Sequence, residues 1–202
     1  LLFSSLFASM YKANRTMGDK YFFEIIMTCV LMSIAYSTPP IRLKSRPGFD
    51  LFINSLGFGF FAFMAGFVSM GNIITPEILK LSVGFAFLFG ALYPLTQIYQ
   101  NEEDNRRGDR TLTLWLGTDK ALALSMGFSL VAFLWFIWGT LHNFGYSILL
   151  LLNLLVWLVL LSHWQRRLLT MSRLDHKKFM YVFLGLWPLT DLIIVGAHFS
   201  RY

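Results

Sequence analysis

A charged segment directly follows an apolar stretch near the middle of the chain, and its residues are the strongest candidates for chemistry. In a helix, steps of four, three and four residues place on one stripe Tyr93, Gln97, Gln100 and Asp104. Glu103 lies beside this stripe, and three guanidinium groups follow it, at Arg106, Arg107 and Arg110. Magnesium takes hard oxygen ligands that it shares with substrate phosphates, and arginine matches phosphate oxygens in two-point geometry. The pattern therefore predicts a site for a Mg²⁺-bound polyphosphate.

The same residues allow a second interpretation. A helix end that carries carboxylates followed by arginines is also typical of a solvated cap at a membrane surface. Gln97 and Gln100 favour the first interpretation, because polar side chains just inside a membrane normally face a cavity and not lipid.

A second segment, residues 35–47, combines helix-breaking and basic residues. Pro39 and Pro40 end the preceding helix, since neither can donate a backbone N–H. Arg42, Lys44 and Arg46 then occupy alternate positions, so in an extended chain they would project to one side together. Such a basic comb suits either a phosphate group of a substrate or the anionic headgroups of membrane lipids.

Long apolar runs must position these segments. Of 202 residues, 56% are hydrophobic and only 14% charged, against about 25% charged in an average soluble domain. A soluble globule, a disordered chain and a coiled coil are excluded by these figures. Six runs reach the length of about 20 residues that a spanning helix needs, at 21–38, 49–72, 78–100, 121–141, 144–162 and 179–197. We predict one all-α, polytopic transmembrane bundle over residues 1–202, with a seventh, partial span at 1–10.

The connections between the runs predict the orientation. Those at 39–48, 101–120 and 163–178 hold 12 of the 17 lysines and arginines, whereas those at 73–77 and 142–143 are short and uncharged apart from Glu77. The positive-inside rule places the basic group in the cytoplasm, against the exception of Lys12, Arg15 and Lys20. We therefore expect a multi-pass protein of the plasma (inner) membrane whose active face is cytoplasmic.

Other site classes find little support. One cysteine, Cys29, excludes a disulfide framework and a thiolate zinc site, and the four histidines at span ends and in loops form no ligand set. The net charge of +6 reports which side the loops occupy, so nucleic acid is not an expected partner, while membrane lipids are. Asp191, inside the last run, is either a functional carboxylate or a neutral one bonded locally.

Two of these segments resemble the UbiA-type intramembrane prenyltransferases. Tyr36-Ser-x-Pro-Pro-x-Arg-Leu-Lys44 is similar to the signature at the end of the family's fourth helix. Asp104-x-x-x-Gly108-x-Arg110-Thr111-Leu112, followed by Leu116-Gly117, is similar to the second aspartate motif and its trailing loop. The resemblance runs from residue 1 to residue 202 and is to proteins like the 4-hydroxybenzoate polyprenyltransferases.

The resemblance implies a nine-helix bundle in which Mg²⁺ holds a polyprenyl diphosphate. Ionisation of its allylic C–O bond gives a carbocation, which is transferred to an aromatic or other lipophilic acceptor. Carried onto this chain, the catalytic positions are Asp104, Gln100 and Gln97, and the metal ligands are Asp104 and Glu103. The substrate-binding positions are Tyr36, Arg42, Lys44, Asn54, Arg107 and Arg110.

The chain departs from the family pattern in two ways. The first aspartate motif, expected on the second helix, does not occur in these 202 residues, so we expect the first two helices to be missing. Gln97 and Gln100 stand where the earlier aspartates of the second motif are expected, and an amide oxygen can ligate Mg²⁺ but brings no charge. A non-catalytic protein that binds isoprenoids or lipids is therefore the alternative.

Overall fold

Six helices long and apolar enough to cross a membrane confirm the predicted polytopic all-α architecture. The computed structural model describes residues 17–200, so the partial span expected at 1–10 lies outside it. Within the described residues the spans are Lys20–Ser37, Phe49–Ser69, Pro76–Ile98, Thr118–Thr140, Phe144–Thr170 and Arg173–Phe199. No strand forms in this part of the chain.

Shorter elements join and interrupt the spans. In chain order the elements are α2 (Met17–Ser37), η1 (Leu43–Ser45), α3 (Phe49–Asn54), η2 (Ser55–Phe61), α4 (Ala62–Ser69), α5 (Pro76–Ile98), α6 (Asn101–Arg107), α7 (Leu112–Leu116), α8 (Thr118–Thr140), α9 (Phe144–Arg167), η3 (Leu168–Thr170) and α10 (Arg173–Phe199). Two starts follow their sequence signals, because the Thr75 hydroxyl caps α5 before Pro76, and Ser172 and Asp175 form a capping box on α10.

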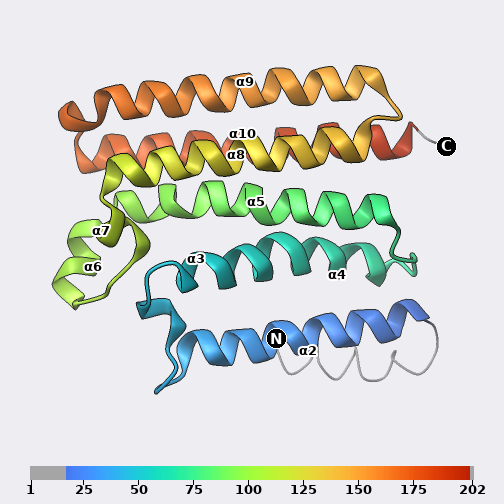
Figure 1. The fold of residues 1–202 in the computed structure, drawn as a ribbon, viewed down its shortest axis with the longest axis horizontal. Helices are drawn as coiled ribbons and strands as arrows, with labels where there is room; N and C mark the ends of the chain where they lie inside the picture. Colours follow the sequence, from blue (N-terminus) through green and yellow to red (C-terminus); the bar gives the residue numbers. More distant parts are fainter. Residues whose placement is uncertain (1–16, 201–202) are drawn as a thin grey trace.

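The helix α5 occupies the centre of the bundle (Figure 1). It packs against α8 on one side and against η2 and α4 on the other, while α10 contacts α5, α8 and α9. The helix α2 packs on η2 and α4 at one edge of the bundle, and α9 packs on α8 at the opposite edge. The small helices α6 and α7 lie at one end of the bundle, beyond the end of α5 (Figure 1).

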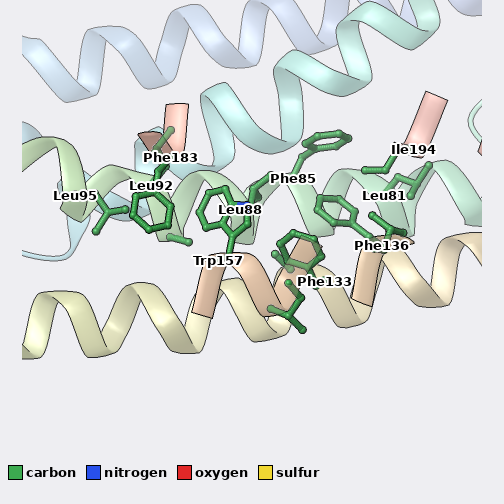
Figure 2. Close-up of a cluster of buried hydrophobic side chains, with 14 of the residues drawn as sticks. Leu81, Phe85, Leu88, Leu92, Leu95, Phe133, Phe136, Trp157, Phe183 and Ile194 are labelled. Carbon is green, nitrogen blue, oxygen red and sulfur yellow. The ribbon is translucent and has the colours of Figure 1, made fainter. Parts of the chain in front are cut away.

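The core is formed by side chains of α5, α8, α9 and α10 (Figure 2). On α5 it contains Leu81, Phe85, Leu88, Leu92 and Leu95, and from the other helices Phe133, Phe136, Trp157, Phe183 and Ile194. By contrast, large apolar side chains on the outer faces of α9 and α2 are exposed, as expected where lipid takes the place of a protein partner.

The span expected at 49–72 is not one regular α-helix. Its middle, η2, is a π-helix of seven residues between α3 and α4. There the chain approaches α5 so closely that a Cβ at Gly59 would lie 2.5 Å from the Phe85 carbonyl oxygen. Gly59 therefore permits the close packing of η2 on α5, whereas a Cβ at Gly57 or Gly66 would meet nothing within 4 Å.

The span expected at 78–100 ends earlier, at Ile98, and Asn101 starts a separate helix, α6. Gly108 ends α6 in the left-handed conformation that glycine adopts without strain. We call the end of the bundle formed by residues 38–48, 99–117 and 168–172 the basic end, because these segments hold or adjoin most of the basic residues.

Candidate active site

Three segments distant in sequence meet at Asp50, in the first turn of α3 at the basic end. Its carboxylate is fully buried and accepts a hydrogen bond from the Gly48 N–H at 2.9 Å. It also accepts from the side-chain amide of Gln97 on α5 at 2.8 Å and from the Leu112 N–H at 3.4 Å. Asp50 therefore links the loop before α3, the end of α5 and the start of α7.

Gln97 is the predicted site residue that the structure places deepest at the basic end. Its side chain is 5% exposed, and its amide nitrogen donates to Asp50. Only the NH₂ group of an amide can donate to a carboxylate, so the Oε1 atom points away from Asp50. That oxygen is buried and has no hydrogen-bond partner among the described residues.

Gln100 does not continue the stripe of Tyr93 and Gln97. The stripe assumed one helix as far as residue 104, but α5 ends at Ile98 and Gln100 is the N-cap residue of α6. Its side-chain amide donates to the Tyr99 hydroxyl at 2.7 Å. The expected common stripe is therefore wrong beyond Gln97, because two residues of turn separate the two helices.

Asp104 lies in α6 and is 8% exposed, the most buried carboxylate in the acidic turn. Burial raises the pKa of its carboxyl above the ordinary value, and repulsion from Asp109 acts in the same direction. The guanidinium group of Arg107 lowers this pKa, and the charge of Glu103 raises it again. A cation bound beside Asp104 would therefore favour the ionised form of its carboxyl.

Glu103, the other predicted metal ligand, pairs with two arginines. One is Arg107 on the same helix, and the other is Arg173 at the start of α10, whose Nη2 lies 3.5 Å from the Glu103 carboxylate. The Nε of Arg173 also donates to the Tyr99 carbonyl at 2.9 Å. Arg173 therefore fastens α10 to the turn that connects α5 with α6.

The basic comb expected at residues 42–46 does not form. Leu43–Ser45 is a 3-10 helix and Arg42 has a left-handed backbone with φ of 36°, so alternate side chains do not share one side. Arg42 instead forms an ion pair with Asp109, with Nη2 and Oδ1 3.7 Å apart. This ion pair joins the two loops that contain the two motifs. Both loops are predicted to lie on the cytoplasmic side.

The remaining predicted basic residues lie on the surface around this pair. Lys44, Arg107 and Arg110 are all exposed at the basic end. Arg107 is paired with Glu103, and Lys44 and Arg110 take part in none of the ion pairs among residues 17–200. The structure thus brings Arg42 and Arg107 to the acidic turns but leaves Lys44 and Arg110 extended towards solvent.

An aromatic wall begins below this polar layer. The hydroxyl groups of Tyr36 on α2 and Tyr93 on α5 are 3.4 Å apart. Phe89 stacks near Tyr93, with ring centres 6.2 Å apart, and contacts the rings of Phe58 and Trp187 at 5.4 Å and 6.1 Å. These rings come from α2, η2, α5 and α10, so they line one side of the bundle below the basic end.

A cavity of about 500 Å³ opens between α2 and the helices η2 and α4. It is mainly apolar, and the predicted residues Tyr36 and Asn54 both line it. The Asn54 amide donates to the main-chain carbonyl of Asp50 at 2.7 Å, one turn earlier in the same helical segment. Asp191 lies elsewhere, on α10 one turn beyond Trp187.

Asp50, Thr113 and Arg173 lie in or directly beside the basic end but were not predicted as site residues from the sequence. Thr113 is buried and donates to Asn101 at 2.6 Å, which fixes α7 against the start of α6. A polar residue at the border of an apolar run was the available signal for Asp50. Its partners, however, are 47 and 62 positions away, and no local pattern indicates them.

The donor set fits a hard divalent cation such as Mg²⁺. Carboxylate and amide oxygens are the protein ligands that Mg²⁺ accepts, and the buried Oε1 of Gln97 is an acceptor that lacks a partner. Within residues 17–200 no three histidine, cysteine or acidic side chains cluster closely enough to hold a metal by themselves. A cation here needs oxygens from another source, as when a diphosphate shares it.

Solved structures with the same fold come from Archaeoglobus fulgidus. A UbiA homolog bound to Cd²⁺ is 21% identical with a TM-score of 0.65 over 96% of this chain and 70% of that one. UbiA homolog structures bound to GPP and Mg²⁺ and to DMAPP and Mg²⁺ are each 20% identical, with TM-scores of 0.61 and 0.63. They align with 93% of this chain, which spans 66% and 65% of their lengths.

A search of curated proteins found no match. The model of the UbiA prenyltransferase family matches residues 1–187, which is most of the chain. The family match and the shared fold both cover far more of the chain than the two short motifs do. The chain belongs to the UbiA prenyltransferase family.

Proposed function

We propose that this protein transfers a polyprenyl group from an isoprenoid diphosphate to an aromatic or other lipophilic acceptor, with Mg²⁺ as cofactor. The observation that carries this proposal is the ion pair of Arg42 with Asp109, which joins the two loops that hold the motifs. Cationic and metal-ligating groups are thereby gathered at one end of an aromatic-lined bundle. The solved family members bound to GPP or DMAPP with Mg²⁺ support the same substrate class.

The polar groups divide into two sets with different tasks. Arg42, Lys44, Arg107 and Arg110 supply guanidinium and ammonium groups for the diphosphate oxygens. Asp104, Glu103, Gln97 and Gln100 supply oxygens for the metal ion, which when bound offsets the charge of the departing diphosphate. Both sets lie at the basic end, which the positive-inside rule places in the cytoplasm.

The apolar groups handle the other half of the reaction. When the allylic C–O bond breaks, its electron pair leaves with the diphosphate and the prenyl carbon becomes electron-deficient. Tyr36 and Asn54 line the cavity of about 500 Å³ just below the basic end. Aromatic faces there stabilise positive charge and the apolar wall excludes water, so the acceptor captures the cation and then releases a proton.

A transfer assay tests this proposal. The full-length protein in lipid nanodiscs is given radiolabelled geranyl diphosphate with an aromatic acid, and in a parallel arm with a glycerol phosphate. We expect transfer that requires Mg²⁺ and that Asp104→Ala lowers by roughly 100-fold, the usual effect of removing one charge-stabilising group. Glu102→Ala is the matched control, because Glu102 is an exposed neighbour on the same helix. Undiminished transfer by Asp104→Ala would remove that residue from the site.

A second function is favoured by the amides at positions 97 and 100. Without two carboxylates the site has less negative charge to hold a metal ion, which suits a protein that binds isoprenoid diphosphates but does not ionise them. Tight geranyl diphosphate binding without Mg²⁺-dependent release of diphosphate supports this alternative. Measurable turnover excludes it.

A further inference from the structure

Asp50 is a buried anion without a cation. Its side chain has no exposed surface, and it accepts three hydrogen bonds, from Gly48, Gln97 and Leu112. None of the ion pairs found among residues 17–200 includes it. The three N–H donors stabilise the carboxylate, but no charged side chain offsets its charge, so a cation bound nearby would interact favourably with it.

The neighbouring Gln97 shows where that cation fits. Its NH₂ group is taken by Asp50 at 2.8 Å, which fixes the amide plane and directs Oε1 away from the carboxylate. The Oε1 atom is buried and has no partner among the described residues. A buried anion without a counterion and a buried acceptor without a donor therefore lie on the two sides of one amide group.

We propose that Asp50 is a positioning residue that holds the Gln97 amide so that its Oε1 is an open ligand for a divalent cation. The inference rests on the proposed function. The Asp50 carboxylate also polarises the Gln97 amide, so the Oε1 atom carries more negative charge than the oxygen of an isolated glutamine side chain. Hydrogen bonds from ligands to carboxylates behind them orient the ligand and raise its basicity in many metal sites.

A purely structural role for Asp50 makes a different prediction. Asp50 ties three segments together, so its loss would loosen the fold whether or not a cation binds. Exchanging the two side chains separates the roles, because Asp50→Asn with Gln97→Glu keeps both shapes and the hydrogen bond between them, and loses only the longer bond from the Leu112 N–H. In the exchanged pair the carboxylate itself occupies the ligand position, while the amide lies behind it.

The experiment compares wild type, Asp50→Asn, Gln97→Glu and the double variant, each as full-length protein in nanodiscs. Binding of Mn²⁺ in the presence of a non-hydrolysable geranyl thiodiphosphate is followed by electron paramagnetic resonance. We expect Asp50→Asn to weaken Mn²⁺ binding by about 10-fold or more, the usual cost of losing a residue behind a metal ligand. The double variant should recover the wild-type affinity to within about threefold.

Thermal unfolding with and without Mn²⁺ provides a second readout. Gln97→Glu places two buried carboxylates side by side, so we expect its unfolding temperature to fall without metal and to rise more than that of wild type when Mn²⁺ is added. This comparison tests the proposal even if Asp50→Asn alone does not fold. Absence of any Mn²⁺ dependence in Gln97→Glu overturns it.

A matched control pair exists at the surface, where the Gln165 amide donates to Asp119 at 2.7 Å. Asp119→Asn with Gln165→Glu is the same chemical exchange and should leave Mn²⁺ binding unchanged. If Asp50→Asn binds Mn²⁺ with wild-type affinity, the inference is overturned and the proposed function is unaffected. The same holds if the double variant binds Mn²⁺ no more tightly than Asp50→Asn does. If wild type binds neither Mn²⁺ nor the diphosphate analogue, the proposed function fails together with it.

Discussion

The hydroxyl group of Tyr36 lies 3.4 Å from that of Tyr93 and joins α2 to α5 across 57 positions of the sequence. The helix α2 otherwise packs mainly on η2 and α4 at the edge of the bundle, where its outer face is exposed. The tyrosine pair is therefore a direct polar link between the edge helix and the central one. It lies just below the basic end, where the position of α2 sets the width of the cavity.

This link predicts energetic coupling between the two tyrosines. In a double-mutant cycle, Tyr36→Phe and Tyr93→Phe should be non-additive by about 0.5–1.5 kcal/mol, the net worth of a typical hydrogen bond. Unfolding in detergent measures the four free energies. Tyr181 is exposed on α10, so Tyr181→Phe is the control and should show no coupling to Tyr93→Phe. Additive effects of the first two changes would contradict the link.

We predict that the stability of the folded protein depends on pH through the carboxyl group of Asp104. Burial and the charge of Asp109 raise its pKa in the folded protein, so the ionised carboxyl opposes folding without metal. The unfavourable contribution is absent below the ordinary pKa, develops as pH rises through the folded value, and is complete above it. Asp104→Asn should therefore raise the unfolding temperature at pH 7, because the amide has no charge to remove from water.

The same measurement well below the ordinary pKa of an aspartate, at about pH 2.5, checks the sign of this effect. We expect the unfolding temperatures of Asp104→Asn and wild type to converge there, because the wild-type carboxyl is then neutral in both states. Glu102→Gln changes an exposed carboxylate on the same helix and should have no effect at either pH. A lower unfolding temperature for Asp104→Asn at pH 7 would show that the carboxylate stabilises the metal-free fold.

Gly59→Ala tests the close approach of η2 to α5. The added methyl group would lie 2.5 Å from the Phe85 carbonyl oxygen and 2.6 Å from the Ala86 Cα, and neither backbone atom can move without shifting α5. We expect a loss of about 1–3 kcal/mol, typical of overpacking, seen as a lower unfolding temperature. Gly57→Ala, whose Cβ meets nothing within 4 Å, should be tolerated. Equal stability of both variants would rule out the tight contact.

Arg42→Gln should weaken substrate binding without loosening the fold. Its ion pair with Asp109 is exposed, and such pairs contribute only about 0–1 kcal/mol to stability. A charge-assisted contact with a phosphate is worth about 1.5–3 kcal/mol, so KM for geranyl diphosphate should rise by about 10-fold or more. Arg166→Gln, an exposed change on α9 at the same end, is the control. An unchanged KM would place Arg42 outside the diphosphate site.

The number of spans could be predicted from the sequence because each apolar run reaches the thickness of a membrane. Gln97 and Asp104 could be placed at one end of the bundle for the same reason, since residues at a span boundary share one depth. The common stripe failed because helical periodicity applies only within one helix, and α5 ends at Ile98. Nothing in the local sequence reports a two-residue turn between polar residues that all favour helix.

The role of Asp50 could not be predicted for a different reason. Its hydrogen bonds run to α5 and to the start of α7, so they exist only after the bundle has formed. Basic residues likewise occupy alternate positions at 42–46, but a 3-10 helix and the left-handed backbone of Arg42 turn their side chains in different directions. Long-range contacts and irregular turns thus decide which charged groups meet.

The turn at Tyr99 and Gln100 also has a mechanical consequence. Gln97 belongs to a helix anchored in the middle of the bundle, whereas Asp104 belongs to a separate helix of seven residues outside it. The distance between these two oxygen donors is therefore set by the turn at Tyr99 and Gln100 and not by the periodicity of one helix. Arg173, bonded to Tyr99 and Glu103, holds this turn against α10, so the last spanning helix helps to fix the spacing of the donors.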